Sequence, residues 1–116
     1  MKNVLVIIPT YNESENILNI IPEVLSKSTS LYQFNVLVID DNSPDGTAKM
    51  VEDLNNPSVY IIKRVMKMGL GTAYIAGFKY AIENNYDYVY EMDADFSHDP
   101  KYLPEFLAKM EEGYDL

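Results

Sequence analysis

The chain has 116 residues, which is the size of one ordinary domain, and 47% of them are hydrophobic, which is enough for a packed core. Its formal net charge of −9 argues against a nucleic-acid partner, because affinity for nucleic acid comes mainly from cations that neutralise phosphates. The absence of cysteine excludes disulfides and thiolate metal sites and favours an intracellular protein, and no apolar run approaches the roughly 20 residues that cross a bilayer.

Four largely apolar segments, separated by helical patterns, predict β-strands. They are residues 4–8, 36–39, 59–62 and 86–92. The continuous run at residues 4–8 is typical of a strand that is covered on both faces. Residue Pro9 is expected to end that strand, and the polar residues 26–33 are expected to form a loop before the second one.

A first helix is expected after residue 12. Asn12 followed by Glu15 fits an N-cap with its reciprocal partner. The apolar stripe of this helix consists of Ile17, Ile21, Val24 and Leu25. Pro22 lies within that stripe, and its missing N–H predicts a kink or a split.

Three further helices are predicted. A short one carries Ala48, Val51 and Leu54, and a last one runs from Pro104 to a stop at Gly113. Between them, residues 72–84 have two apolar faces. One face is a stripe of mostly small residues that would allow close approach to a sheet: Ala73, Ala76, Gly77, Tyr80 and Ala81. The second face consists of Ile75, Phe78 and Ile82, which predicts a helix buried on both sides.

Strands that alternate with helices, joined by connections too long for hairpins, predict an α/β fold with a mostly parallel sheet. There is no internal repeat or linker, so residues 1–116 form part of a single domain. Residues 114–116 fall where the alternation predicts another strand. We therefore expect the chain to be the N-terminal part of a longer protein.

Ligands of open parallel sheets bind beyond the carboxyl ends of the strands. The predicted strand ends here carry turn formers and acids, and one edge of the sheet would bring them together. These residues are Thr10 and Tyr11 after the first strand, Asp40, Asp41 and Asp45 after the second, Lys63 and Arg64 after the third, and Asp93 and Asp95 after the fourth. Lys63 and Arg64 are interpreted as solvated cations, with binding to a phosphate as the alternative.

Asp93 and Asp95 project to the same side if the last strand extends that far. Two carboxylates on one side repel each other unless a cation lies between them, and oxygen ligands suit a hard divalent ion. An extended chain would aim Ser97 at the same metal, while His98 fits better as a neighbour that orients the loop. A solvated surface turn is the alternative reading of these residues.

Tyr11 has the flat ring that could stack beside a nucleotide base, and Asp41 has the oxygens to accept hydrogen bonds from a base or ribose. With a phosphate-bridging metal at Asp95, the set describes a pocket for a nucleoside diphosphate. The alternatives are that Tyr11 only packs on the sheet and that Asp45 only caps a helix. A dinucleotide loop is rejected, because Tyr74 stands where the third glycine would be.

Four motifs together resemble glycosyltransferase family 2, and the resemblance covers essentially the whole chain. They are Pro-Thr-Tyr-Asn-Glu at residues 9–13, Asp-Asp-Asn-Ser-Pro-Asp-Gly-Thr at 40–47, Gly-Leu-Gly-Thr-Ala-Tyr at 69–74 and Asp-Ala-Asp-Phe-Ser-His at 93–98. The second and third motifs most resemble the branch of polyprenol-phosphate (dolichyl-phosphate) mannosyltransferases. The resemblance implies a GT-A fold, a nucleotide-sugar donor and a Mg²⁺ or Mn²⁺ ion.

Residue by residue, the resemblance implies a binding site for GDP-mannose. The guanosine part would be held by Pro9, Tyr11, Glu13, Ile39 and Asp41. The ribose and diphosphate would lie along Asp93, Ala94 and Asp95. Asp95 would also be the catalytic metal ligand, with Ser97 as a second ligand; some relatives have Gln at the latter position.

The implied reaction transfers mannose to dolichyl or polyprenyl phosphate at the cytoplasmic face of a membrane, with inversion of the anomeric centre and metal-assisted departure of GDP. One alternative is a family 2 enzyme that uses UDP-glucose or another nucleotide sugar. A second is a nucleotide-binding module without transfer activity of its own. A third, from another class, is a phospho-receiver signalling domain, which also places acids at the ends of parallel strands.

Overall fold

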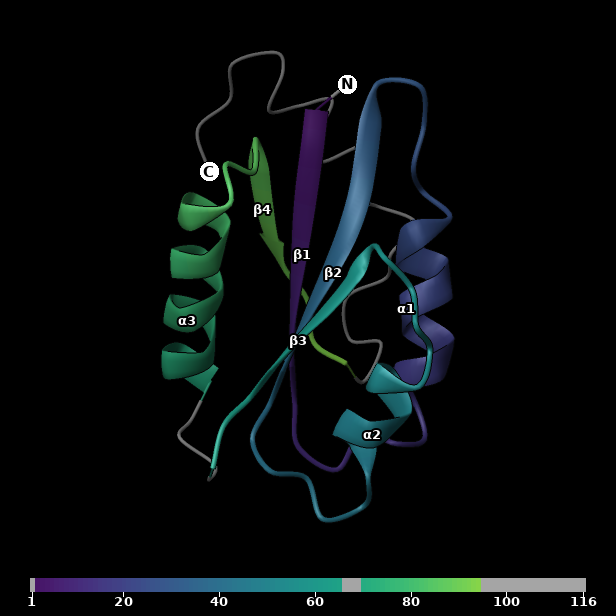
Figure 1. The fold of residues 1–116 in the computed structure, drawn as a ribbon, viewed down its shortest axis with the longest axis vertical. Coiled ribbons are helices and arrows are strands. Elements are labelled where there is room, and N and C mark those ends of the chain that lie inside the picture. Colours follow the sequence, from purple (N-terminus) through teal and green to yellow (C-terminus); the bar gives the residue numbers. More distant parts are fainter. Residues whose placement is uncertain (1, 66–69, 95–116) are drawn as a thin grey trace.

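The structure is a computed structural model that describes residues 2–65 and 70–94 (Figure 1). Strands and helices alternate along it: β1 (Lys2–Thr10), α1 (Ile17–Leu25), β2 (Tyr32–Asp40), α2 (Thr47–Glu52), β3 (Val59–Lys63), α3 (Leu70–Glu83) and β4 (Tyr88–Glu91). The predicted alternation is therefore confirmed over this part of the chain. The helix predicted at residues 104–113 and the strand predicted after it lie outside the described residues.

The four strands form one parallel sheet in the order β3-β2-β1-β4. This is the strand order of the doubly wound α/β fold, in which β1 lies between β2 and β4. A phospho-receiver has the order 2-1-3-4-5, in which β1 lies between β2 and β3. The receiver alternative is therefore wrong, and the predicted α/β class with a parallel sheet is confirmed.

Helices cover both faces of the sheet: α1 and α2 lie on one face and α3 lies on the other (Figure 1). Right-handed crossovers explain this division. The chain moves outward from β1 to β2 and β3, which puts α1 and α2 on the same side. It then returns across the sheet to β4, and the reversed direction puts α3 on the opposite side.

The central strand β1 supplies side chains to two separate cores, because successive residues point to opposite faces. Val4, Val6 and Ile8 belong to the core under α1, whereas Leu5 and Ile7 belong to the core under α3. All five are 0% exposed. Full burial of each such side chain contributes about 1.5–3 kcal/mol. The expected burial of this strand on both faces is confirmed.

Strand β1 continues through Pro9 to Thr10, so the prediction that Pro9 ends it is wrong. The reason lies in the pairing of β1 with its neighbours. The carbonyl of Ile7 accepts a hydrogen bond from Met92 N, so Ile7 faces the β4 side, and Pro9 faces the same side two residues later. Strand β4 ends at Glu91, opposite Ile7. The missing N–H of Pro9 therefore costs no ladder hydrogen bond.

Helix α1 begins later than its sequence predicts. Asn12 has φ +57° and lies in a turn, and the first helical residue is Ile17. The carbonyl of Glu13 accepts hydrogen bonds from Asn16 N and Ile17 N, which shapes the turn before the helix. Pro22 lies within a continuous helix, so the predicted split is also wrong. A fully buried stripe holds these turns against the sheet: Ile17, Ile20, Ile21 and Val24.

Strand β2 starts at Tyr32 rather than at residue 36, so the preceding loop is shorter than predicted. Its first residues pair with the start of β1, where Lys2 lies opposite Tyr32. The hydrophobic pattern alone missed this extension, because Gln33 and Asn35 interrupt it. Asn35 is nevertheless only 7% exposed, and its amide donates to the carbonyl of Val4 at 3.4 Å.

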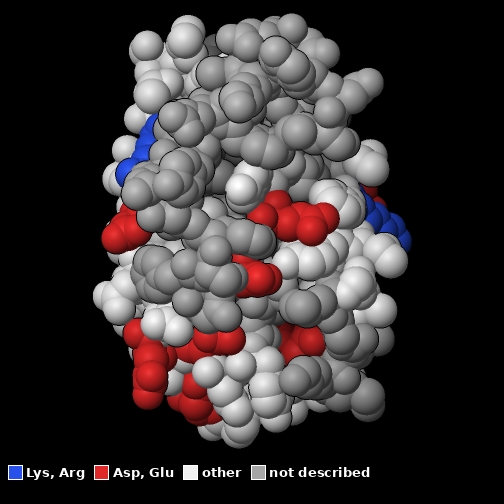
Figure 2. Space-filling model, turned by 180° about the vertical axis from the view of Figure 1, so that it is seen from behind, with Lys and Arg blue, Asp and Glu red and all other residues white. Residues whose placement is uncertain are grey.

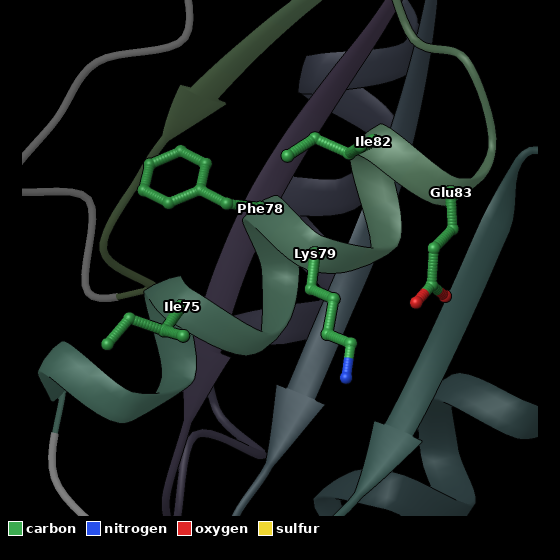
Figure 3. A pocket seen from close by; sticks show the side chains of 5 residues that line it. All are labelled: Ile75, Phe78, Lys79, Ile82 and Glu83. Carbon is green, nitrogen blue, oxygen red and sulfur yellow. The ribbon is translucent and has the colours of Figure 1, made fainter.

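Helix α3 lies close on the sheet, as its small residues predict. A Cβ placed on Gly77 would come within 2.5–2.8 Å of three side-chain carbons of Ile7. The prediction that α3 is buried on both sides is wrong: Ile75 is 67% exposed and Ile82 is 77% exposed. Within the described residues, α3 packs on the sheet through one face, and its second apolar face borders a hollow (Figure 3).

Candidate active site at the carboxyl ends of the strands

The ends of β1 and β2 lie side by side. Thr10 pairs with Asp40 in the sheet, and Asp41 N donates to the carbonyl of Thr10 at 3.1 Å. Tyr11 and Asp41 therefore begin two adjacent loops. The Tyr11 side chain is on the surface, with 39% of the residue exposed, whereas Asp41 is 6% exposed. The sheet thus brings together the aromatic residue and the carboxylate that the sequence selects as base-contacting.

The end of β4 lies on the other side of β1. Glu91 pairs with Ile7, and Met92 N donates to the carbonyl of Ile7 at 3.0 Å. Asp93 follows directly and is partly buried. In doubly wound sheets of this order, ligands bind beyond the carboxyl ends of the strands at which the order reverses, which here are β1 and β4. Asp93 therefore lies at the edge where a ligand is expected.

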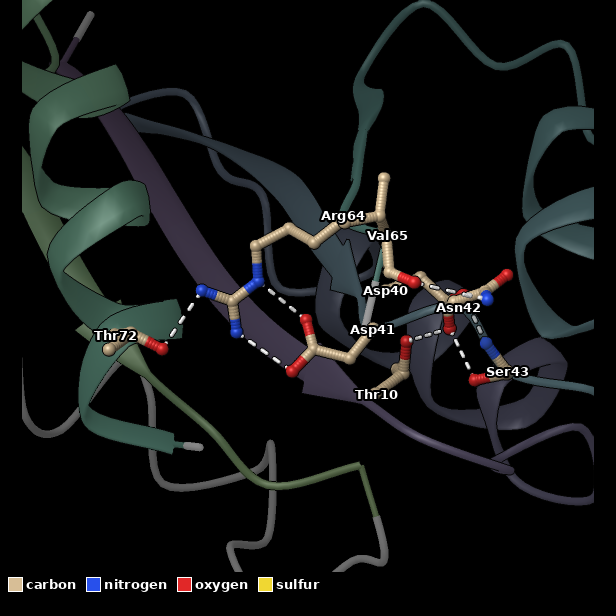
Figure 4. Close-up of polar contacts among 8 residues, drawn as sticks. All are labelled: Thr10, Asp40, Asp41, Asn42, Ser43, Arg64, Val65 and Thr72. Carbon is tan, nitrogen blue, oxygen red and sulfur yellow. Dashed lines mark hydrogen bonds and ion pairs between the residues drawn. The ribbon is translucent and has the colours of Figure 1, made fainter. Parts of the chain in front are cut away.

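Asp40 holds the loop together instead of facing a ligand (Figure 4). It is 1% exposed, and its carboxylate accepts three hydrogen bonds: from Thr10 Oγ1 at 2.7 Å, from Ser43 N at 2.9 Å and from Ser43 Oγ at 2.6 Å. A buried carboxylate needs such donors, since it cannot be solvated. Asp40 thus fixes the start of the loop after β2, and it does not belong to the set of ligand-facing acids that the sequence suggested.

Asp45 is a structural acceptor as well. Its carboxylate accepts from Ser14 N at 3.0 Å and from Thr47 N at 3.1 Å, and the Thr47 hydroxyl donates to it too. Burial acts to raise the pKa of Asp45, but the hydrogen bonds from Thr47 and Ser14 outweigh it and lower the pKa to about 2. Thr47 is the first residue of α2 and Gly46 is its N-cap, so Asp45 contacts the start of the helix from the residue before the N-cap.

Two further contacts tie the loop after β1 to the loop after β2. Asn12 N donates to Ser43 Oγ at 2.9 Å, and Glu13 N donates to Thr47 Oγ1 at 3.2 Å. The side chains of the second loop thus accept from consecutive backbone N–H groups of the first. This explains why the Asp-Asp-Asn-Ser-Pro-Asp-Gly-Thr motif is rich in short polar residues: their side chains hold the backbone of the loop that carries Tyr11.

Asp41 forms a bidentate ion pair with Arg64 (Figure 4). Arg64 Nε lies 2.5 Å from Asp41 Oδ1, and Arg64 Nη2 lies 2.8 Å from Asp41 Oδ2. The two side chains are only 12% and 9% exposed. Arg64 Nη1 also donates to Thr72 Oγ1 at 3.0 Å. The interpretation of Arg64 as a solvated cation is therefore wrong, whereas its neighbour Lys63 is exposed and pairs with Glu52.

Asp93 also has a partner on α3. The hydroxyl of Tyr74 donates to Asp93 Oδ1 at 3.2 Å. Burial and the adjacent charge of Asp93 raise the pKa of Tyr74 to about 12, so the hydroxyl keeps its proton at neutral pH. Thr72 and Tyr74 stand two residues apart at the start of α3. Through them this helix contacts both acids of the described site, Asp41 by way of Arg64 and Asp93 directly.

The remaining predicted site residues differ in how far their side chains are exposed to solvent. Pro9 and Glu13 are partly buried, and the side chains of Ile39 and Ala94 lie in the cores, at 0% and 3% exposed. Any contact of Ile39 or Ala94 with a nucleotide would therefore come from the backbone. Asp95 and Ser97, the predicted metal ligands, lie outside the described residues.

The donor chemistry at the end of β4 suits a hard cation, because Asp93 presents carboxylate oxygens at the ligand edge. Within residues 2–65 and 70–94 no group of three or more His, Asp or Glu side chains is arranged to hold a metal ion. The predicted ligands Asp95 and Ser97 follow Asp93 closely in the sequence.

Sequence reasoning placed Arg64 at this edge but not as the partner of Asp41, and it missed Thr72 and Tyr74 as parts of the site. Arg64 directly follows β3, the neighbour of β2, and a carboxylate predicted at the buried end of β2 needs a cationic partner. That requirement was the available signal for Arg64. Thr72 and Tyr74 belong to the Gly-Leu-Gly-Thr-Ala-Tyr motif, to which the resemblance assigned no role.

Acidic side chains are exposed on one face of the molecule. Figure 2 shows a face on which Asp and Glu side chains are spread over the middle and lower parts, with Lys and Arg at the margins. The strands end toward the lower part of this view.

The hollow beside α3 is a different surface, lined by Ile75, Phe78, Lys79, Ile82 and Glu83 (Figure 3). No residue of the strand ends lines it, so it is not the candidate active site. Among the described helices none has the length and apolar character of a membrane span.

Comparison with known proteins agrees with this geometry. Residues 5–116 match the family model "Glycosyl transferase family 2". The chain belongs to glycosyltransferase family 2.

Two curated relatives are similar over nearly the whole chain. The "Undecaprenyl-phosphate mannosyltransferase" of Micrococcus luteus is 47% identical over 107 residues, which are 90% of this chain and 42% of the relative. The "Polyprenol monophosphomannose synthase" of Mycolicibacterium smegmatis is 43% identical over 115 residues, which are 97% of this chain and 42% of the relative. The chain thus spans about two-fifths of the length of these relatives.

Solved structures confirm the GT-A fold. Residues 1–349 of S. aureus TarS match with a TM-score of 0.76 and 26% identity, covering 97% of this chain and 33% of that one. The mannosyltransferase PcManGT from Pyrobaculum calidifontis, in complex with GDP-Man and Mn²⁺, matches with a TM-score of 0.60 and 25% identity, covering 67% of this chain and 24% of that one.

Proposed function

We propose that the protein transfers mannose from GDP-mannose to a polyprenyl phosphate such as dolichyl phosphate, and that this chain carries the donor-binding half. The observation that supports it most is the meeting of Tyr11, Asp41 and Asp93 at adjacent strand ends. The two curated relatives, at 43–47% identity, are both named for mannose transfer to polyprenol carriers.

In the proposed donor complex the guanosine lies over the ends of β1 and β2. The ring of Tyr11 packs beside the base, and Asp41 accepts hydrogen bonds from it. Pro9, Glu13 and the backbone of Ile39 complete this part of the site. The ribose and diphosphate extend toward β4 and contact Asp93, Ala94 and Asp95.

Asp95 and Ser97 would hold Mg²⁺ or Mn²⁺, and the structural neighbour from Pyrobaculum calidifontis carries Mn²⁺ with GDP-Man. When bound, the ion supplies positive charge where the departing GDP becomes more negative. Asp93 carries a further negative charge beside it, and the hydrogen bond from Tyr74 keeps that carboxylate in place.

The acceptor phosphate is anionic near neutral pH, so it attacks the anomeric carbon without a strong general base. Attack from the face opposite the leaving GDP inverts that centre. A polyprenyl chain resides in a membrane, and we infer that the protein works peripherally at a cytoplasmic membrane face.

A UDP-sugar donor is the second candidate, favoured by one specific observation. S. aureus TarS, which shares the fold and 25–28% identity, has been solved with UDP and with UDP-GlcNAc. The two readings differ in the base that Asp41 contacts and in the sugar that is transferred.

A transfer assay separates these candidates. The full gene product is incubated with vesicles that contain a polyprenyl phosphate, with Mn²⁺ and with either GDP-mannose or UDP-glucose that carries a radiolabelled sugar. We expect label in the lipid fraction from GDP-mannose alone. Label from UDP-glucose alone would establish the second candidate, and label from neither donor would support a module that binds nucleotide without transfer.

A further inference from the structure

We propose that the exposed apolar face of α3 is the docking surface for residues 104–113 of the same chain, for which the sequence predicts an amphipathic helix. The face consists of Ile75, Phe78 and Ile82. Docking there would cover the face that the described residues leave exposed. Residues 104–113 lie outside the described residues; the surface of α3, the topology of the sheet and the sequence point to their place.

The face is a single stripe along α3. Its three residues are spaced three and four positions apart, and such positions lie on one side of a helix. They are 67%, 38% and 77% exposed, whereas Ala73 and Ala81 on the sheet side of the helix are 1% and 2% exposed. Together with Lys79 and Glu83 the stripe lines the hollow (Figure 3). Clustered apolar side chains that line a hollow are typical of a contact surface, whereas scattered ones need no explanation.

The stripe faces the side of α3 on which β4 lies. In Figure 3 the side chains of Ile75, Phe78 and Ile82 extend toward the β4 side, and that of Glu83 extends toward β3. Strand β4 is the last strand in the order β3-β2-β1-β4, so its outer edge has no partner strand within the described residues. A segment that crosses from β4 to a further strand would pass alongside this stripe if it lies on the same face of the sheet as α3.

The handedness of the crossover determines that face. Helix α3 connects β3 to β4 and lies opposite α1 and α2, because this crossover runs in the reverse direction across the sheet. A crossover from β4 outward to the next parallel strand continues in that direction, so the right-handed rule puts its helix on the α3 face. Neighbouring helices pack about 8–10 Å apart, so their facing side chains interdigitate.

Residues 104–113 have the pattern that fits this place. Pro104 suits the first position of a helix, and the apolar stripe consists of Phe106, Leu107 and Met110. Helix α3 begins at the carboxyl ends of the strands, where the Tyr74 hydroxyl contacts Asp93. A helix that follows β4 begins at the same edge and runs back along the sheet. The two helices would therefore be parallel, with their apolar stripes side by side.

A second copy of the chain and a membrane fit the surface less well. A stable interface between two proteins takes about 20–30 residues from each partner. The hollow is lined by five of the described residues. The net charge of −9 opposes binding to an anionic lipid surface. A helix of the same chain can dock on a smaller area, because its covalent attachment to β4 keeps its local concentration high.

Pairs of introduced cysteines test the contact in the full gene product. Residues 1–116 contain no cysteine, and any that the full gene product has elsewhere is replaced by Ser. Phe78→Cys is combined in turn with one of three partners and oxidised with diamide: Phe106→Cys, Leu107→Cys or Met110→Cys. A disulfide requires Cα atoms within about 7 Å, so we expect at least one pair to form an intrachain disulfide in the monomer, detected by mass spectrometry.

The control for the disulfide is a cysteine on the other face of the sheet. Leu18 on α1 is 38% exposed, as Phe78 is, and α1 lies on the face opposite α3. Leu18→Cys should form no intrachain disulfide with any of the same three partners.

Thiol labelling measures the cover independently. Ile82 is 77% exposed and the side chain of Lys49 on α2 is 76% exposed, so cysteines at the two positions would react alike with a maleimide if nothing covered α3. We expect Ile82→Cys in the full gene product to react at least about tenfold more slowly than Lys49→Cys. Adding Leu107→Asp should bring the two rates to within about threefold, whereas Ala108→Asp, on the opposite side of the predicted helix, should leave Ile82→Cys protected.

Four results would overturn the inference. Equal labelling of Ile82→Cys and Lys49→Cys, with no disulfide in any pair, would show that the face stays exposed. Protection that persists in Leu107→Asp, again without a disulfide, would assign the face to another part of the chain. Protection that appears only as the protein concentration rises, with disulfides between chains, would assign it to a second copy. Protection that appears only with lipid vesicles would assign it to a membrane.

This inference goes beyond the proposed function and does not depend on it, because it concerns how the domain is assembled. None of the four results bears on the binding of GDP-mannose. Failure of the inference and failure of the proposed function are therefore distinguishable.

Discussion

The hydroxyl of Tyr74 donates to Asp93 Oδ1 at 3.2 Å and so joins the start of α3 to the carboxyl end of β4. Tyr74 is the last residue of the Gly-Leu-Gly-Thr-Ala-Tyr motif, and Asp93 is the first residue of the Asp-Ala-Asp motif. The two motifs lie 19 residues apart in the sequence and in contact in the structure. The contact gives the first motif a role: it orients an acid of the proposed donor site.

Tyr74→Phe should therefore weaken donor binding with little change in the fold. The ring remains, but Asp93 loses a hydrogen bond, which for a charged acceptor corresponds to about 1.5–3 kcal/mol, or roughly a tenfold to hundredfold weaker affinity. Because burial and Asp93 raise the pKa of Tyr74 to about 12, the hydroxyl stays protonated and the loss should be constant between about pH 7 and pH 9.

The measurement for Tyr74→Phe is titration with GDP and Mn²⁺. The matched control is Tyr80→Phe on the same helix, where the ring packs against Tyr60 and Tyr86 and lies away from the strand ends. Equal affinities in wild type and Tyr74→Phe would show that the hydroxyl does not support the donor site.

Asp95→Ala should abolish metal-dependent sugar transfer by the full gene product, since Asp95 is the proposed principal ligand of Mg²⁺ or Mn²⁺. The measurement is transfer activity as a function of metal concentration. Asp53→Ala, which removes an exposed carboxylate on the far end of α2, serves as the control and should retain activity. Full activity of Asp95→Ala at ordinary Mg²⁺ concentrations would defeat the metal assignment.

Gly77→Ala should destabilise the fold, because the added Cβ would lie 2.5–2.8 Å from carbons of the fully buried Ile7. Overpacking of this kind costs about 1–3 kcal/mol, and the better helix propensity of Ala offsets up to about 1 kcal/mol of that cost. Gly71→Ala, on the same helix, is the control: its Cβ would meet nothing within 4 Å. Urea denaturation measures both, and equal stabilities of the two variants would contradict the close packing of α3.

Asp45→Asn should lower stability in a pH-dependent way. The folded pKa of Asp45 is about 2, below its ordinary value of 3.8, so the ionised carboxylate stabilises the folded state. That stabilisation is complete above about pH 4 and is lost as the pH falls through about 2. The difference in unfolding midpoint between wild type and Asp45→Asn should therefore shrink over this window. A difference that stays constant down to pH 2 would show that the charge of Asp45 is not the cause.

The sequence predicted those parts of the fold that depend on local hydrophobic pattern. Apolar side chains occupy both faces of β1, with Val4, Val6 and Ile8 on one and Leu5 and Ile7 on the other, so this strand must be buried on both faces in any topology. Helix α3 needs small residues such as Gly77 to approach the sheet. Boundaries were less predictable, because pairing with a neighbouring strand extended β2 back to Tyr32 and allowed Pro9 to remain in β1.

Within the candidate site, the sequence identified Tyr11, Asp41 and Asp93 by their positions after strands. It selected Asp41 rather than Asp40 as the base-contacting acid, but only the sheet shows the physical difference between them, because Asp40 points at Thr10 and Ser43. It did not show that Arg64 reaches Asp41, since that contact depends on β3 lying beside β2. Long-range partners of this kind follow from strand order, which no local pattern contains.

A crystal structure of the full gene product with GDP-mannose and Mn²⁺ tests the central claim most directly. We predict one nucleotide across the carboxyl ends of β1, β2 and β4, with its base at Tyr11 and Asp41 and its diphosphate near Asp93 and Asp95. A nucleotide bound anywhere else, such as in the hollow beside Phe78 on the outer face of α3, would contradict the account.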